Sequence, residues 1–370
     1  MKVLFVYKYL TLGGVEAVIR ARLDGLRRCG LEVHAWFLVD GPGRGMFAGM
    51  EPFLHVGDVG ALSVHLARER YDVVSSIDTE EAFPAMHQVA PHGRLVLEVH
   101  SPYRENVVYL RWLEMLEIAA FLVPSRFQAS VVRGSLGWHA PIHVVPNPLR
   151  QAFAVEPEAF EHKPPHPVVA WVGRLDRVKN WPEFLKVAAV LLARAHLVEF
   201  WVVGQADEPD VEHWFLRRAG RLGVLSRMRW FRDFPHEQMP RLLDAVRDSG
   251  GVIVSTSRFE SFGMTVAEAM ARGCAVVVPE RGPFDEFVAH GTTGFLYPPG
   301  SPARAAELVE MFLRDAILRR ECGLNGRKAI LARHGPDQAI PVLVQVLWEL
   351  VRRPVNEAAD LHDPFSEVRS

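Results

Sequence analysis

Short apolar runs rich in β-branched residues alternate along the chain with longer stretches whose apolar residues recur at helical spacing. Val3–Tyr7 predicts a strand, and Val15–Arg28 predicts the helix that follows it and ends at Gly30. Apolar runs this continuous are typical of strands covered by helices on both faces, so a parallel sheet is expected. Further strands in this half are expected at Val33–Val39, Asp72–Ile77, Leu95–Val99, Phe121–Val123 and His143–Val145.

The same alternation restarts after Pro146–Pro148 and the stretch Glu156–Pro167, whose Pro-, Glu- and His-rich composition indicates a linker. Two such series predict an α/β protein with two doubly wound, Rossmann-like domains over residues 1–150 and 151–335. A C-terminal helix over 336–353 is expected to pack back toward the first domain, and residues 354–370 are expected to form a mobile tail. Strands of the second half are expected at Val168–Val172, Val198–Val203, Gly251–Ser255 and Ala275–Val278, with helices at Trp181–Arg194, Val211–Leu222 and Gly263–Arg272.

The composition limits the number of domains and the kinds of partner, but it does not indicate a function. The 370 residues are enough for two or three domains, and a net charge of −2 does not favour nucleic acid as a partner. Cys29, Cys274 and Cys322 are too few and too irregularly spaced for a disulfide framework or a metal knuckle, and we interpret them as buried small residues in a reducing cytoplasm.

Nothing in the sequence reads as a signal peptide or a membrane-spanning run. A cytoplasmic location is therefore expected, with peripheral contact at the inner membrane face left open. Val107–Leu116 is apolar with interleaved charges and is either an interfacial helix or, the commoner case, a helix facing the core.

Ligands of doubly wound sheets bind beyond the carboxyl ends of the strands, so residues just after strands are the candidates for chemistry. Thr11–Glu16 follows the first strand, and its Gly13-Gly14 pair allows close backbone approach to an anion at a helix start; a plain tight turn is the alternative. His100 ends another strand, where an imidazole can contact a sugar hydroxyl or be merely structural.

Gly173 opens the loop that follows the first strand of the second half, and Arg174 and Lys179 lie in that loop. Two fixed cations can stabilise the negative charge of a departing diphosphate. A solvated basic loop is the alternative interpretation.

The segment Ser257–Ala271 carries the strongest motif, with Glu260 in a loop and Glu268 on the helix beyond it. Backbone amides at Gly263, Met264 and Thr265 would cap a phosphate. Glu268 suits the hydroxyls of a ribose, and Glu260 suits those of a donor sugar or a place near its anomeric carbon. Capping or solvent exposure is the alternative for both carboxylates.

This segment resembles the paired-glutamate motif of the family-four retaining glycosyltransferases. Five other signatures agree with that family in order and spacing, so the resemblance covers roughly residues 1–350. They are Gly13–Glu16, Val123–Ser125, Val144–Asn147, Gly173-Arg174 with Lys179, and Glu286 with Gly294–Leu296.

The resemblance implies a GT-B fold, a UDP- or GDP-type sugar donor held mainly by the second domain, and transfer with retention. It implies roles for His100, Arg174, Lys179 and Glu260 in catalysis. The implied donor-binding residues are Gly13, Gly14, Gly173, Gly204, Ser261, Phe262, Gly263, Met264, Thr265 and Glu268.

No cofactor or metal is expected, because no Asp-x-Asp site is present and the resemblance implies an enzyme that needs no metal. The resemblance also implies that the leaving diphosphate helps take the acceptor proton, so that no separate carboxylate base is required. The acceptor, whether glycan, lipid or small molecule, and the oligomeric state are left open. Gln205-Ala206-Asp207 and Asn180 depart from the glycines usual in the family. The alternatives are a catalytically silent sugar-nucleotide-binding partner protein and another GT-B enzyme, a phosphorylase or an epimerase.

Overall fold

The computed structural model describes residues 1–86, 89, 93–101, 103, 107–111, 117–136, 141–160, 163–206 and 208–352. The chain divides into two compact units. The first comprises Met1–Pro146 together with the described residues from Ala339 on, and the second comprises Asn147–Gln338. Asp207, part of Val107–Leu116 and the residues after Arg352 therefore lie outside the described parts.

The first unit is built on a seven-stranded sheet in the order β3-β2-β1-β4-β5-β6-β7, with every neighbouring pair parallel. Its strands are β1 (Lys2–Tyr9), β2 (Glu32–Val39), β3 (Leu54–Val56), β4 (Val73–Ile77), β5 (Arg94–Glu98), β6 (Ile118–Val123) and β7 (Ile142–Val144). Its helices are α1 (Gly14–Arg28), α2 (Val59–Arg68), α3 (Phe83–Met86), α4 (Arg126–Ser135) and most of α12 (Pro336–Arg352), with short 3₁₀ turns at Pro42–Phe47, Glu51–Phe53 and Glu80–Ala82.

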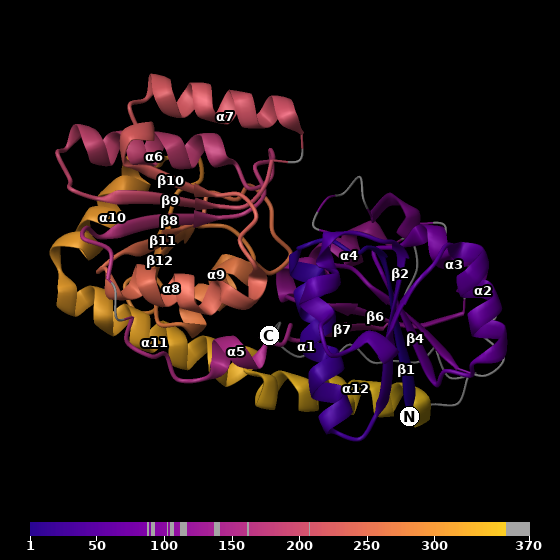
Figure 1. Ribbon diagram of the computed structural model, residues 1–370. Helices are drawn as coiled ribbons and strands as arrows, with labels where there is room; N and C mark the ends of the chain where they lie inside the picture. The colour runs from indigo at the N-terminus through magenta and orange to yellow at the C-terminus, as the bar shows by residue number, and fades with distance from the viewer. Residues whose placement is uncertain are drawn as a thin grey trace. The chain divides into compact units, whose positions relative to one another are not determined.

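Alternate residues of the buried strand β1 enter two different cores. Val3 and Phe5 pack with α1 and with the apolar stripe of α12 that begins at Ile340, whereas Leu4 and Val6 pack with α2 and α4 on the other face. Figure 1 shows α1 and α12 on the same side of this sheet. The two-residue period of a strand covered on both faces explains why the run reads as continuously apolar.

The second unit repeats the plan with a six-stranded parallel sheet in the order β10-β9-β8-β11-β12-β13. Its strands are β8 (Val168–Val172), β9 (Glu199–Val203), β10 (Met228–Phe231), β11 (Val252–Val254), β12 (Ala275–Pro279) and β13 (Phe295–Tyr297). Its helices are α5 (Gln151–Ala154), α6 (Trp181–Ala193), α7 (Pro209–Arg221), α8 (Met239–Asp248), α9 (Met264–Ala271), α10 (Pro302–Arg314) and α11 (Ala316–His334), with 3₁₀ turns at Leu225–Arg227, His236–Gln238 and Phe284–Glu286.

Helices cover both faces of this second sheet. Val169 and Trp171 pack with α6, α7 and α10, and Val168 and Ala170 pack with α8, α9 and Ile330 of α11. Figure 1 shows α6 and α7 on one side and α8, α9 and α11 on the other. Two doubly wound parallel sheets confirm the predicted fold class.

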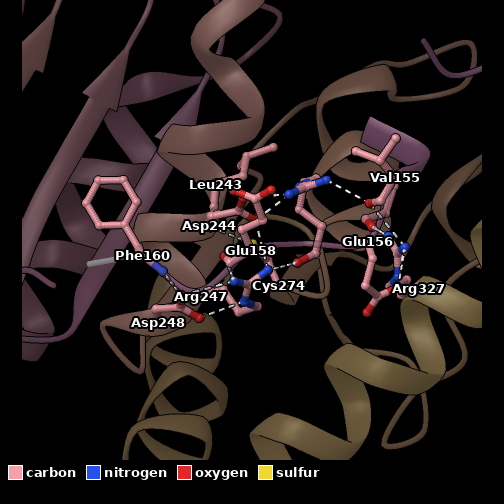
Figure 2. Close-up of polar contacts among 12 residues, drawn as sticks. Val155, Glu156, Glu158, Phe160, Leu243, Asp244, Arg247, Asp248, Cys274 and Arg327 are labelled. Carbon is pink, nitrogen blue, oxygen red and sulfur yellow. Dashed lines mark hydrogen bonds and ion pairs between the residues drawn. The ribbon is translucent and has the colours of Figure 1, made fainter. Parts of the chain in front are cut away.

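Part of the expected linker is held firmly to the second unit by arginines (Figure 2). Arg247 Nη2 donates to the Glu158 carbonyl at 3.0 Å, and the Phe160 amide donates to Asp248 Oδ2 at 2.7 Å. Arg272 Nη1 donates to the Val155 carbonyl at 2.9 Å. The Pro- and Glu-rich composition of residues 156–167 indicated a linker, but the Glu158 carbonyl and the Phe160 amide both have side-chain partners in the second unit.

The expectation for the cysteines was wrong at one position. Cys274 and Cys322 are buried, but Cys29 is exposed, because it caps the carboxyl end of α1 just before the turn at Gly30. Val107 and Leu110 are fully buried, which agrees with a core-facing role for the described part of that segment. No helix among the described residues combines the length and apolar character needed to cross a bilayer.

Candidate functional site

The loop after β8 is held in place by the neighbouring strand and by its own aspartate. The Gly173 amide donates to the Val203 carbonyl at 2.9 Å, and the Leu175 amide donates to the Gln205 carbonyl at 2.8 Å. Asp176 Oδ1 accepts from the amides of Val178 and Lys179 at 2.9 and 2.7 Å. Lys179 is therefore presented on a fixed backbone at the carboxyl end of the sheet.

Lys179 Nζ lies 2.5 Å from Glu260 Oε1, and the two side chains are only 20% and 12% exposed. The structure thus brings together two predicted site residues from different loops. The Arg258 amide donates to the Val178 carbonyl at 2.7 Å, so the two loops are also joined through their backbones. Arg174 is different: its side chain is 63% exposed and lies 3.2 Å from Asp176 Oδ2.

Thr256 anchors both loops, and the sequence analysis missed it. Its Oγ1 accepts from Trp171 Nε1 at 3.0 Å and lies 2.9 and 3.0 Å from the carbonyl oxygens of Lys179 and Asn180, to one of which it donates its single hydrogen. The only sequence signal was its position directly after a strand. A buried hydroxyl with these three neighbours ties the Lys179 loop to the end of β11.

Backbone conformation explains two of the predicted glycines and one departure from the family pattern. Gly204 has φ 136°, and a Cβ there would lie 2.0 Å from the Gly173 carbonyl oxygen. Gly173 itself gives room for the stem of Lys179, whose Cγ would lie 3.0 Å from an added Cβ. Asn180 has φ 54°, a left-handed conformation that asparagine tolerates nearly as glycine does. The replacement of glycine at this position therefore preserves the loop.

Gly263 caps the start of α9 with φ 96°, and an added Cβ there would lie 2.6 Å from a ring carbon of Phe284. Within the described residues, the amides of Gly263, Met264 and Thr265 have no assigned acceptor, as is usual for the first turn of a helix. These donors can hold an anion. Among the predicted donor-binding residues, Phe262 has a side chain that is buried against Phe287, so only its backbone can contact a ligand.

Glu268 lies four residues into α9 and is almost fully buried. His236 Nε2 lies 3.3 Å from Glu268 Oε1, and Arg150 Nη1 lies 2.9 Å from His236 Nδ1. Since the guanidinium can only donate, Nδ1 of His236 is the acceptor and Nε2 carries the hydrogen that faces the carboxylate. His236 therefore orients Glu268, a relation with no signal in the sequence.

In the first unit, His100 belongs to a buried polar group. Glu98 accepts from Arg22 Nη1 at 2.5 Å and from Ser75 Oγ at 2.6 Å, and His100 Nε2 lies 3.2 Å from Glu98 Oε2. Burial by itself raises the pKa of Glu98, but the charges and hydrogen bonds of Arg22 and His100 outweigh it and lower the pKa to about 2. The anionic carboxylate fixes the Nε2–H tautomer of His100, which leaves Nδ1 for another partner.

Asp78 is the second carboxylate of this buried group and contacts the backbone of His100. Its carboxylate accepts from the His100 amide, with N–O distances of 3.1 and 3.0 Å, and its own backbone has φ 41°. Complete burial raises the pKa of Asp78 to about 6, a shift that His100 partly offsets. Both carboxylates thus hold His100 in one position.

The Gly13-Gly14 loop is braced by Glu16. Glu16 Oε1 accepts from the Thr11 amide at 2.8 Å and from the Thr11 hydroxyl, and the side chain is almost fully buried. A Cβ at Gly13 would lie 2.6 Å from Glu16 Oε2. Glu16 therefore shapes the loop, while Gly14 begins α1.

Comparison with known protein families gives a match within the second unit. Residues 154–329 match the family described as Glycosyl transferases group 1. The chain is 22% identical to the alpha-1,3/1,6-mannosyltransferase ALG2 of Homo sapiens, over 94% of this chain and 96% of that protein. It is 26% identical to the alpha-D-kanosaminyltransferase of Streptomyces kanamyceticus, over 50% of this chain and 46% of that enzyme. That second match thus spans less than half of the relative.

Solved structures share the fold over nearly the whole chain. The Anabaena protein Alr3699/HepE, solved in complex with UDP and glucose, superposes with a TM-score of 0.79 at 19% identity and covers 94% of this chain and 100% of its own. TarM superposes with a TM-score of 0.78 at 11% identity, over 95% and 99%. The fold, the motif loops and the family match agree. Residues 154–329 belong to the glycosyl transferases group 1 family, and the chain is a nucleotide-sugar-dependent glycosyltransferase with the GT-B fold.

Proposed function

We propose that the protein is a retaining transferase that moves a hexose from a UDP-hexose to an acceptor hydroxyl. The observation that carries the proposal is the Lys179–Glu260 pair, which lies on the loops that follow β8 and β11, the second of which leads to the open amides at the start of α9. UDP is the nucleotide we favour because the Anabaena structural relative was solved with UDP and with UDP-glucose.

In this proposal the second unit binds the donor. The amides of Gly263, Met264 and Thr265 hold the diphosphate, and Ser261 lies beside them. Gly173 and Gly204 let the loops after β8 and β9 approach each other and the stem of Lys179 closely. Glu268, oriented by His236, accepts hydrogen bonds from the ribose hydroxyls. Arg174, whose side chain is largely exposed, contributes a second cation.

Lys179 and Glu260 act on the reacting bond. As the anomeric bond breaks, negative charge moves to the departing diphosphate, and a fixed ammonium gains attraction that it lacks in the ground state. Glu260 contacts sugar hydroxyls whose hydrogen bonds strengthen as the ring becomes cationic. The departing diphosphate takes the acceptor proton on the face it leaves, so the new bond has the original configuration and no separate base is needed.

For the first unit the proposal rests on the resemblance. His100 contacts the sugar through Nδ1, since Nε2 is directed at Glu98. Gly13 and Gly14 let the backbone approach the donor or acceptor closely. The acceptor is a hydroxyl compound of unidentified class.

A ligand screen tests the donor. UDP and UDP-hexoses should raise the melting temperature more than GDP, ADP and their sugars at equal concentration, since binding to the folded state alone adds stability. Preference for GDP or ADP would reject the UDP assignment and leave the transferase assignment intact.

Product analysis tests the reaction. With a panel of sugar, inositol phosphate and lipid-linked acceptors, transfer should continue in excess EDTA, and NMR should show the anomeric configuration of the donor in the product. Inversion, or loss of transfer in EDTA with recovery on adding Mg²⁺ or Mn²⁺, would overturn the mechanism. Phosphorolysis with inorganic phosphate, or epimer formation without an acceptor, would favour the other GT-B enzymes.

A further inference from the structure

Three histidines from separate elements meet at one edge of the first unit. His34 lies on β2, His55 on β3 and His65 on α2, and one ring nitrogen from each lies within 4.8 Å of the others. Parallel pairing sets Trp36 of β2 opposite His55 of β3, which brings His34 and His55 onto adjacent strands. The sequence spacings follow no metal-binding pattern, so only the fold assembles the group.

We propose that His34, His55 and His65 form a binding site for a divalent transition metal, with Zn²⁺ the best match. Imidazole nitrogens are preferred ligands of zinc, and three protein ligands plus a water make a common four-coordinate set. A zinc ion binds such nitrogens at about 2.0–2.1 Å, so the three rings need to close inward by about 1 Å. Rotation of the side chains supplies a movement of that size.

The group has an unmet ligand atom. Nε2 of His55 is buried and has no hydrogen-bond partner among the residues the structure describes. Buried polar atoms are nearly always paired, so an unpaired imidazole nitrogen beside two others is what an absent ion would explain. The ring of His55 is held by stacking on Trp36, with centroids 5.7 Å apart and planes 26° apart.

Tyr71 orients the other two rings. Its hydroxyl oxygen lies 2.7 Å from His34 Nδ1 and 2.8 Å from His65 Nε2. A hydroxyl has one hydrogen, so it can donate to only one of these nitrogens and must accept from the other. Burial raises the pKa of Tyr71 well above its ordinary value, so it stays a neutral hydroxyl that supports the rings rather than a phenolate ligand.

The local charges suit a cation. Burial is the main cause that lowers the pKa of all three histidines, that of His34 to about 4, so the three rings are uncharged at neutral pH. Lys2 is the nearby positive charge, and it is paired with Glu32 at 3.1 Å and with Glu69 at 2.6 Å. The carboxylates of Glu32 and Glu69 together outweigh the single positive charge of Lys2, so these three side chains carry a net negative charge beside the histidines.

The group is separate from the residues proposed for sugar transfer. His34 pairs with Leu4 near the beginnings of β2 and β1, whereas Gly13 and His100 follow the carboxyl ends of β1 and β5. A metal here would tie β2, β3 and α2 together. The proposed site therefore lies apart from the residues proposed for transfer, and the inference does not depend on the proposed donor or mechanism.

The test uses tag-free, full-length protein stripped with EDTA and then dialysed free of the chelator. Calorimetric titration with Zn²⁺ should show about one equivalent bound, Co²⁺ should give the intense visible absorption of a tetrahedral site, and Zn²⁺ should raise the melting temperature. His55→Gln should weaken Zn²⁺ binding by at least about 100-fold, because it removes a direct ligand. Loss of a residue that only supports a ligand already costs up to about 100-fold. His213→Gln, an exposed histidine on α7, is the control and should bind as the wild type does.

Circular dichroism checks that the variants fold, and His65→Gln replaces His55→Gln if the latter does not. Absence of saturable binding would overturn the proposal. So would binding that His55→Gln and His65→Gln leave unchanged, or a Co²⁺ spectrum typical of octahedral water and carboxylate ligands. Transferase activity should be equal in all these proteins, which keeps the result independent of the proposed function.

Discussion

Lys179 and Glu260 are 81 positions apart in the sequence, yet their charged atoms lie 2.5 Å apart at the carboxyl edge of the second sheet. The sequence motifs assigned one to the diphosphate and the other to the sugar. Their contact means that each holds the other in place before a donor binds. Substitution of either residue is therefore expected to affect both proposed roles.

Lys179→Ala should lower kcat by at least about 100-fold, because a fixed cation stabilises the charge that develops on the leaving group. Arg174→Lys should also lower kcat, since an ammonium does not reproduce the planar guanidinium fork. Lys186→Ala, an exposed lysine on α6, is the control and should turn over normally. Normal rates in the first two variants, with unchanged circular dichroism, would reject the diphosphate assignment.

The two glutamates should separate in steady-state kinetics. Glu260→Gln should lower kcat and kcat/KM together, because its proposed contacts strengthen in the transition state, whereas Glu268→Gln should mainly raise the Kd for UDP. The double variant Lys179→Ala/Glu260→Gln should lose less than the sum of the two single losses, since the residues are in contact. Reversed effects of the two glutamate variants would exchange their roles, and strict additivity would argue against a shared function of the pair.

His236→Ala should weaken UDP binding about 10-fold, or about 1.4 kcal/mol, while leaving kcat nearly unchanged, because it removes the imidazole that lies 3.3 Å from Glu268 Oε1 and orients it. His236→Asn, which keeps a donor, should recover part of the affinity. Calorimetric titration with UDP and a measurement of kcat on each variant test whether His236 acts on nucleotide binding alone. A loss in kcat at unchanged KM would mean that His236 acts on the reaction rather than on the ribose site.

Asp244→Asn should destabilise the second unit by about 3–5 kcal/mol, because it leaves the buried guanidinium of Arg272 without its counter-charge. Asp244 accepts from Arg272 Nη2 at 2.5 Å and from Arg247 Nη1 at 2.8 Å, and these arginines also hold residues 155–158 (Figure 2). Urea denaturation followed by tryptophan fluorescence measures the change, and the exposed variant Glu321→Gln should stay within about 0.5 kcal/mol of wild type. An Asp244→Asn variant as stable as that control would contradict the ion-pair account.

Stability should fall as the pH drops from about 6.5 to 4, in part through His334. Burial lowers the pKa of His334 to about 4, while its Nδ1 lies 3.0 Å from the Asn147 carbonyl. Between these values the unfolded chain binds the proton and the folded chain does not, so the folded state loses up to about 3 kcal/mol. His334→Gln should show a shallower loss in urea titrations at pH 7 and 4.5; an equal loss would remove His334 as a contributor.

Local pattern was sufficient for the family, the fold class and the positions of the main strands. Val168–Val172 is predicted and observed as a strand with the same limits, and the helix expected at Gly263–Arg272 runs over Met264–Ala271. Three short strands, β3, β10 and β13, were missed because three or four residues are too few to show a period. The family and enzyme class are confirmed, and the roles of the individual site residues stay predictions.

The sequence by itself determined the features that depend on residues close together in the chain. These are the alternating apolar runs, the glycines at turns and the motif loops that follow strands. The tertiary structure alone decided which side chains meet. Lys179 with Glu260, His236 with Glu268, and the three histidines around Tyr71 each join segments whose proximity depends on strand order and register. The exposure of Cys29 likewise follows from its place at a helix end. Such contacts form across tens of residues, and no local periodicity encodes them.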